Sequence, residues 1–239
     1  MKVIEINTTS AVLSKSVLFE GIAQPELPVL LDCLDPKIKS YRKNDFIAIA
    51  GEHCEGIGII LEGEGAVIKE NAAGSRMMMV VLKPGDIFGE VAVFASNPVW
   101  PSSVMAQETT KALFIPRHKL IGECPKLCSW HRLIIQNMLK ILSEKAMMLN
   151  RKVEYLALKS MRGKIGAFLL EQYQKTGKTM FELPLNRNEM ADFLNVSRPS
   201  MSREMSRMKA EGIIDFHLST VRILDLETLK RMANEDQKP

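Results

Sequence analysis

The chain has 239 residues, of which 46% are hydrophobic and 25% charged, a balance typical of a globular protein with room for two domains. No apolar run approaches the roughly 20 residues of a membrane-spanning helix. The N-terminus lacks the apolar core of a signal peptide, and four scattered cysteines suit a reducing cytoplasm, so we expect a cytoplasmic protein. The net charge is only +4, but residues 1–120 carry a net charge of −2, so the positive charge lies in the second half.

Between Phe46 and Ile115, glycines alternate with short apolar runs that are rich in β-formers. Strands at short, regular spacing with glycine turns predict an antiparallel β-roll of the double-stranded β-helix, or jelly-roll, type. Within it we expect a hairpin tip at residues 71–75 and a turn at residues 84–86, where Pro and Gly stand in the preferred order. We place this first domain at residues 1–122.

A long helix is predicted from Pro125 to about Leu158, because glycine and proline are absent after its start and apolar residues recur at steps of three and four. The helix is apolar on two sides. The economical arrangement packs one side on its own roll and the other on a second copy of the chain, so we expect a homodimer. The alternative is a helix buried in a monomer. We place the dimer helix at residues 123–158.

The third predicted domain, residues 159–239, contains a helix-turn-helix between Asn186 and Ile214. Asn186 and Glu189 form a capping box for the first helix. Asn195 tolerates the left-handed conformation that the turn requires. Ser197 is expected to cap the second helix, and Pro199 falls in its first turn, where the missing N–H costs nothing.

The second helix has two faces. Met201, Met205 and Met208 are spaced as one buried stripe. Of the polar residues, we expect Arg198, Ser202 and Arg203 to read bases, because Arg can bridge guanine O6 and N7 and Ser adapts to several partners. The contacts to DNA phosphates are assigned to Arg187, Asn188 and Ser200. The alternative is an amphipathic helix whose polar face is only solvated.

Two short β-type runs follow, Ile213–Phe216 and Thr220–Ile223, and they predict a hairpin, or wing, behind the reading helix. Asp225 then caps a last short helix from Leu226 to Met232. One short helix reads few bases, so a dimer with two such helices would read a palindromic site in double-stranded DNA.

The order of these motifs resembles the Crp/Fnr family of transcription regulators. That resemblance rests on Gly163, the Ser202–Arg203 pair and glycine-rich runs within the roll, at residues 51–52, 60–65, 74 and 84–90. It implies an α+β fold with an effector-type sensor roll, a dimer helix and a winged helix-turn-helix. It also implies a DNA-binding regulator rather than an enzyme, with RNA polymerase as a further partner. Neither a nucleophile elbow nor a phosphate loop is present in the sequence.

One departure concerns the effector. In the cyclic-AMP binders of this family, a Gly-Glu pair is followed about a dozen residues on by an Arg that takes the phosphate. Gly89 and Glu90 are kept, but Trp100 or Pro101 stands where the Arg would be. A buried phosphate needs a cation or several N–H donors, so cyclic AMP is not the expected effector. An unidentified effector could still occupy a pocket lined by Gly89, Glu90, Trp100, Ser102 and Ser103.

By family position, Leu149 and Asn150 of the dimer helix would contact this effector and shift the population between DNA-competent and incompetent forms. In a second interpretation the roll is only a scaffold and the dimer binds DNA without a ligand. A third makes the chain a metal, haem or redox sensor, because Cys124, Cys128 and His131 share one helix face. The alternative is that the two cysteines are small buried thiols and that His131 is a surface or interface residue, so no metal site or cofactor is assigned.

Overall fold

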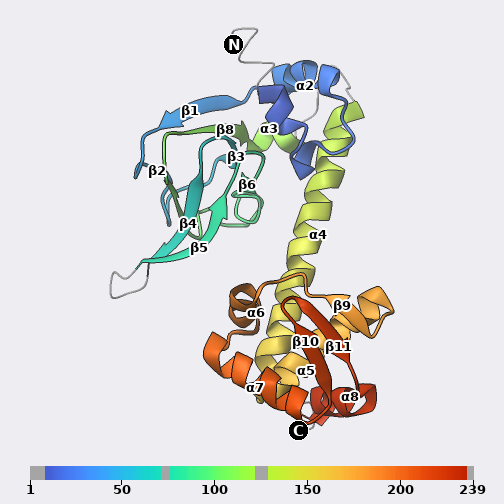
Figure 1. Cartoon of the computed structure of the whole chain (residues 1–239). Helices are drawn as coiled ribbons and strands as arrows, with labels where there is room; N and C mark the ends of the chain where they lie inside the picture. Colours follow the sequence, from blue (N-terminus) through green and yellow to red (C-terminus); the bar gives the residue numbers. More distant parts are fainter. Residues whose placement is uncertain (1–8, 71–75, 122–128, 236–239) are drawn as a thin grey trace. The chain divides into compact units, whose positions relative to one another are not determined.

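The computed structural model describes residues 9–70, 76–121 and 129–235, which fall into two compact units (Figure 1). The first unit runs to Glu144 and the second starts at Lys145. Helix α4 (Ser129–Ala157) contributes its first part to one unit and its last part to the other, so the boundary lies inside a helix. Among the described residues, no helix is long and apolar enough to cross a membrane.

Two four-stranded antiparallel sheets form the roll of the first unit, which confirms the predicted fold (Figure 1). One sheet has the order β1-β8-β3-β6 and the other β2-β7-β4-β5. The predicted tip at residues 71–75 lies outside the described residues. The strands are β1 (Lys37–Tyr41), β2 (Phe46–Ala48), β3 (Gly56–Glu62), β4 (Gly65–Glu70), β5 (Arg76–Leu82), β6 (Ile87–Phe88), β7 (Ser103–Ala106) and β8 (Thr110–Pro116).

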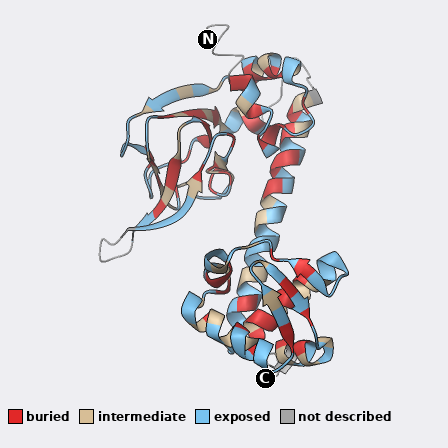
Figure 2. Ribbon diagram, in the orientation of Figure 1, coloured by how far each residue is buried: buried red, intermediate tan, exposed pale blue. Residues whose placement is uncertain are grey.

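Strand β3 is the centre of this core, because its residues from Gly56 to Leu61 are buried on both faces (Figure 2). Gly58 is required there, since a Cβ would lie 2.1 Å from the Phe88 ring. The roll begins earlier than the predicted Phe46, because its strand β1 already starts at Lys37. The helical elements of this unit are η1 (Val17–Phe19), η2 (Gln24–Glu26), α2 (Leu27–Leu34) and α3 (Arg117–Ile121).

The first half of α4 belongs to the same core. Ile134, Met138 and Ile141 recur at steps of four and three and are buried against the roll and its helices. The predicted packing of the long helix on its own roll is therefore present. Asn137, on the same side, donates two hydrogen bonds to the backbone oxygens of Leu18 and Glu20, at 3.0 and 2.8 Å.

The second unit has its own core, formed by four complete helices, the last turns of α4 and a small antiparallel sheet of order β10-β11-β9 (Figure 2). Tyr155, in the last turn of α4, and Leu158, directly after this helix, are buried in this core. Its elements are α5 (Met161–Thr176), β9 (Met180–Glu182), α6 (Arg187–Leu194), α7 (Arg198–Ala210), β10 (Ile214–His217), β11 (Thr220–Ile223) and α8 (Leu226–Glu235).

Two details of this unit differ from expectation. The sequence predicts a loop at residues 174–180, whereas strand β9 already begins at Met180, because Phe181 of that strand pairs with Val221 of the wing and is buried. The sequence also predicts a linker at residues 159–163, and the observed linker after α4 is shorter. Ser160 Oγ accepts a hydrogen bond from the Gly163 N–H at 2.8 Å, so helix α5 already begins at Met161.

Candidate nucleic-acid interface

Helix α6 starts at the capping box that the sequence predicts. The Asn186 side chain accepts hydrogen bonds from the N–H groups of Asn188 and Glu189, at 2.9 and 3.0 Å. Glu189 returns the contact by accepting from the Asn186 N–H at 2.8 Å. These reciprocal bonds satisfy N–H groups that the first turn of a helix leaves free, and they fix where α6 begins.

The turn between α6 and α7 is made as expected. Asn195 adopts φ = 52° and ψ = 54°, which places it in the left-handed region and ends α6 sharply. Ser197 then caps α7 by accepting from the Ser200 N–H at 3.3 Å, and proline stands in the first turn of α7. Two short helices are thus held in the arrangement that presents the second helix of a helix-turn-helix to a DNA groove.

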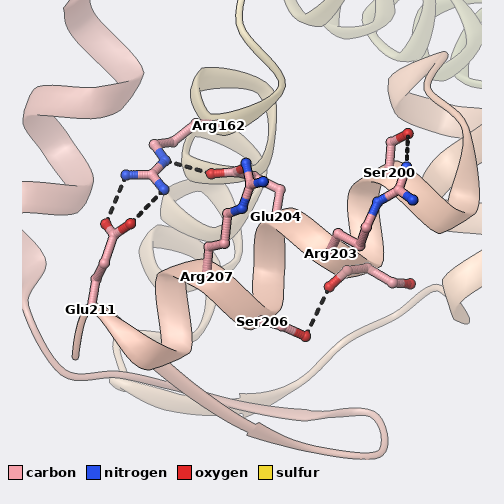
Figure 3. Close-up of polar contacts among 8 residues, drawn as sticks. Arg162, Ser200, Arg203, Glu204, Ser206, Arg207 and Glu211 are labelled. Carbon is pink, nitrogen blue, oxygen red and sulfur yellow. Dashed lines mark hydrogen bonds and ion pairs between the residues drawn. The ribbon is translucent and has the colours of Figure 1, made fainter.

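Helix α7 has one buried and one exposed face. Met201, Met205 and Met208 are completely or almost completely buried, which confirms the predicted stripe. Arg198 and Arg203 are exposed and Ser202 is partly exposed. The Arg203 guanidinium donates to Ser200 Oγ at 3.1 Å, and Ser206 Oγ donates to the Ser202 carbonyl at 3.0 Å (Figure 3). The predicted base-reading residues therefore lie off the buried stripe.

The three predicted phosphate-contacting residues differ in surroundings. Asn188 is exposed in the first turn of α6, and Ser200 is partly exposed. Arg187 instead points toward the wing. Its guanidinium lies 5.0 Å from the centre of the Phe216 ring and donates to Met205 Sδ at 2.8 Å and to the Leu218 carbonyl at 3.4 Å. These contacts join α6 to α7 and to the wing. Burial of the guanidinium lowers the pKa of Arg187.

The wing is the hairpin of β10 and β11, with Ile214 opposite Ile223 and His217 opposite Thr220. Lys209 of α7 reaches it through an ion pair of 2.6 Å with Asp215, and its ammonium lies 5.2 Å from the centre of the Phe216 ring. Leu218 at the tip has φ = 51° and is 81% exposed. The wing is thus anchored at its base to the reading helix.

Sequence reasoning missed Arg162. This residue lies in the first turn of α5 and makes ion pairs with Glu204 and Glu211, at the middle and the end of α7 (Figure 3). Arg162 precedes the two glutamates by 42 and 49 positions, and no local pattern in the sequence joins it to them.

In the roll, Gly89 and Trp100 are in direct contact. Gly89 has φ = 84°, and a Cβ on it would lie 2.6 Å from the Trp100 ring. The Trp100 ring is 9% exposed and lies 5.8 Å from that of Phe88, measured between centroids. Glu90 is buried next to them, Ser102 is partly exposed, and Ser103 Oγ accepts from the Ala50 N–H at 3.0 Å. The indole therefore fills the space beside the Gly-Glu turn.

Comparison with known proteins decides the family. The family model of the cyclic nucleotide-binding domain matches residues 38–124, and that of the Crp-like helix-turn-helix domain matches residues 163–232. The chain belongs to the Crp/Fnr family of transcription regulators. It is therefore a transcription regulator with a helix-turn-helix DNA-binding domain, and not an enzyme.

Individual relatives agree with this Crp/Fnr assignment over nearly their whole length. The cyclic AMP receptor protein of Thermus thermophilus is 21% identical, with 91% of this chain and 97% of the relative covered. A CRP-like cAMP-activated global transcriptional regulator of Mycobacterium tuberculosis is 22% identical, with 93% and 98% covered. The crystal structure of the Thermus thermophilus catabolite activator protein is similar in fold, with a TM-score of 0.53, 20% identity and coverage of 92% and 99%.

The residues of this Crp/Fnr roll do not fit a cyclic nucleotide at the predicted place. The phosphate of such a ligand needs a cation or several N–H donors when it is buried. Trp100 offers an indole there, and its ring lies against Gly89 instead of leaving room beside it. The other predicted pocket residues, Leu149 and Asn150, are exposed on the part of α4 that belongs to the second unit. The Asn150 amide donates to Glu154 at 2.9 Å.

The remaining candidate, a metal or haem site, involves residues 124 and 128, which lie outside the described residues. His131 is described and buried, and its Nε2 lies 3.2 Å from the Lys119 carbonyl oxygen. Within the described part of the chain, no group of three His, Cys, Asp or Glu side chains could hold a metal ion.

Proposed function

We propose that the protein is a homodimeric, sequence-specific regulator that reads palindromic double-stranded DNA with α7. The observation that carries this proposal is the exposed Arg203 on the side of α7 away from the buried methionines, next to Ser202. An arginine in the N-terminal half of such a helix can donate two parallel hydrogen bonds to guanine O6 and N7. Arg198, five residues earlier and also exposed, is the second base-reading candidate.

For the phosphate contacts we propose Asn188 and Ser200, which lie at the starts of α6 and α7, where helix N–H groups also favour an anion. Arg187 adds positive charge to this surface while its guanidinium holds the wing. Contacts of this kind fix the register on the duplex and make binding sensitive to salt.

Dimerisation through α4 is supported by a second stripe on this helix. Its members recur at alternating steps of four and three residues, which is the heptad pattern of a two-stranded coiled coil. All members of this second stripe are exposed in the single chain except Leu142, which is partly exposed. The first stripe, formed by Ile134, Met138 and Ile141, is buried on the roll. The exposed stripe is formed by Ile135, Leu139, Leu142, Ala146, Leu149, Val153 and Leu156.

A second copy of the chain is the partner that such a repeating apolar stripe fits, because two identical stripes bury each other around a two-fold axis. The groove beside it has a volume of about 240 Å³ and an entirely apolar lining that includes Phe94, Ile135 and Leu139. A dimer places two α7 helices on one duplex, which is the reason for proposing a palindromic site. RNA polymerase is the proposed further partner, and the cytoplasm, where DNA and polymerase are available, the proposed location.

We also propose that the roll controls DNA binding through an effector near Glu90 that differs from cyclic AMP. The buried Glu90, together with Trp100 and the proposed Ser103, would give the site a polar and aromatic lining. The contact between Trp100 and Gly89 favours the second candidate function, in which the roll is a scaffold and the dimer binds DNA without a ligand.

The decisive experiment is the selection of bound sequences from random duplex DNA by the full-length protein, with and without an extract of cell metabolites. A palindromic consensus supports the proposed dimeric reader, and no enrichment of any sequence contradicts it. Thermal unfolding in the presence of nucleotides and small metabolites then separates the two candidates. An effector that binds the folded roll raises the melting temperature, while a scaffold roll responds to none of them.

A further inference from the structure

Arg162 is joined to the reading helix by three short contacts (Figure 3). Its Nη1 and Nη2 donate to the two carboxylate oxygens of Glu211 at 2.7 and 2.8 Å, and its Nε donates to Glu204 at 2.6 Å. Such a fork fixes direction as well as distance, because the guanidinium is planar and its donors are parallel. The hydrogen bonds to Glu211 and Glu204 raise the pKa of Arg162, and the bond from Arg162 lowers that of Glu211.

The two acceptors lie on one side of α7. Glu204 and Glu211 are seven residues apart, which is about two turns of an α-helix. Glu204 follows Met201 by three residues and precedes Met208 by four, so it borders the buried stripe, and its side chain is only 13% exposed. The contact with Arg162 therefore holds α7 by the edge of its buried face, at two levels.

This arrangement determines the direction of the DNA-facing residues. Arg203 immediately precedes Glu204 and thus points about 100° away from it around the helix axis. A rotation of α7 that displaced Glu204 would displace Arg203 by the same angle. The methionine stripe alone resists such a rotation weakly, since Met side chains are unbranched and adapt to altered neighbours.

We propose that Arg162 is a positioning residue for DNA recognition, which fixes the rotation of α7 by holding Glu204 and Glu211 and thereby aims Arg203 at the bases. This inference rests on the proposed function of Arg203. If α7 were rotated, Arg203 would lose its base contacts, while neighbouring residues would still contact phosphates. The loss of affinity should therefore be larger for the preferred sequence than for other DNA.

The test uses the full-length protein and two duplexes of equal length and composition, the one enriched by selection and a scrambled one. Arg162→Ala should bind the enriched duplex about tenfold more weakly and the scrambled duplex less than about twofold more weakly. Arg162→Lys keeps the charge without the fork, so its ratio of the two affinities should lie between those of the wild type and Arg162→Ala.

Arg207→Ala is the matched control. Arg207 also contacts Glu204, at 3.5 Å, but it is 72% exposed and makes no fork. Its loss removes one positive charge from the same helix, and it should weaken binding to both duplexes equally.

The proposal is overturned if folded Arg162→Ala keeps the wild-type ratio of affinities, or if it weakens both duplexes equally as the control does. Circular dichroism and thermal unfolding establish that each variant is folded. If Arg162→Ala melts below the assay temperature, the comparison is made with Arg162→Lys, for which an unchanged ratio is equally decisive. A wild-type protein without any sequence preference would contradict the proposed function instead.

Discussion

Tyr155, near the end of α4, donates a short hydrogen bond from its hydroxyl group to the Glu171 carboxylate of α5. Its ring is buried against Phe168 and Phe193, at centroid distances of 6.2 and 5.3 Å. Lys175 and Arg151 complete the contacts of Glu171, at 2.6 and 3.2 Å. The last turns of α4 are therefore packed into the core of the DNA-binding unit and do not form a free linker to it.

Replacing Tyr155 by Phe should test the polar part of this connection. The ring and its packing remain, while a partly buried hydrogen bond to a charged group is lost, so the free energy of unfolding of the second unit should fall by about 1 kcal/mol. Urea unfolding of wild type, Tyr155→Phe, Glu171→Gln and the double variant measures the coupling. Additive effects of the two single changes would show that the hydroxyl and the carboxylate do not interact.

The Glu171 carboxylate should also make the free energy of unfolding depend on pH. Burial acts to raise the pKa of Glu171, but the hydrogen bonds from Lys175 and Tyr155 prevail and hold it below its ordinary value. Because the pKa of Glu171 is lower in the folded protein, its contribution to stability is fully present above the unfolded pKa of about 4.3. This contribution is lost as the pH falls through the folded pKa. The difference in unfolding free energy between wild type and Glu171→Gln should thus shrink below about pH 4. A difference that is constant from pH 3 to pH 7 would exclude this role.

Arg203→Ala should lose about 1–3 kcal/mol of binding free energy at one base pair of each half-site and relax the preference there. Fluorescence anisotropy with duplexes that carry each of the four base pairs at that position measures the change. An equal loss on all four duplexes would assign Arg203 to the DNA backbone.

The stripe on α4 offers a comparison between two neighbouring residues. Leu149 belongs to the exposed heptad stripe, whereas Met148, which is as exposed, stands outside it. Leu149→Glu should convert the dimer to a monomer, because a charge at this position would have to be buried without a partner, and Met148→Glu should remain dimeric. Analytical ultracentrifugation decides between these outcomes. A dimer that survives Leu149→Glu, or is lost equally in both variants, would place the interface elsewhere.

At the wing tip, Leu218 holds a left-handed conformation that favours glycine and buries almost none of its side chain. Leu218→Gly should therefore raise the free energy of unfolding by about 0.5–1 kcal/mol, since relief of the strain outweighs the extra freedom of glycine in the unfolded chain. The neighbouring Ser219→Gly, which relieves no such strain, should be neutral or destabilising. Thermal unfolding compares the two, and a destabilised Leu218→Gly would show that the tip is unstrained.

The helix-turn-helix could be predicted almost residue by residue, because its signals are local. Asn186 and Glu189 are three residues apart, Asn195 marks the turn, and the spacing of Met201, Met205 and Met208 identifies the buried face. Each feature acts within one or two helical turns, so the sequence alone determines it. The antiparallel roll was predictable for the same reason, from short apolar runs rich in β-formers and separated by glycine turns.

What escaped prediction depends on residues that are distant in the sequence. Strand β9 exists because Phe181 pairs with Val221, forty positions later. The contact of Arg162 with Glu204 and Glu211 joins segments about fifty residues apart, and the role of Arg187 in holding the wing depends on Phe216. Charged residues carry no periodic signal of their partners, so sequence patterns indicate only that they are near a surface.

The methionines on the buried face of α7 affect how such a protein can change the DNA sequence that it recognises. Three flexible thioether side chains form the inner side of this helix, and all three are buried. Substitutions at the outward positions can therefore be accommodated by small readjustments of the sulfur-containing side chains, without a new core. A protein of this design is free to acquire new operators by mutation of a few surface residues while its domain remains folded.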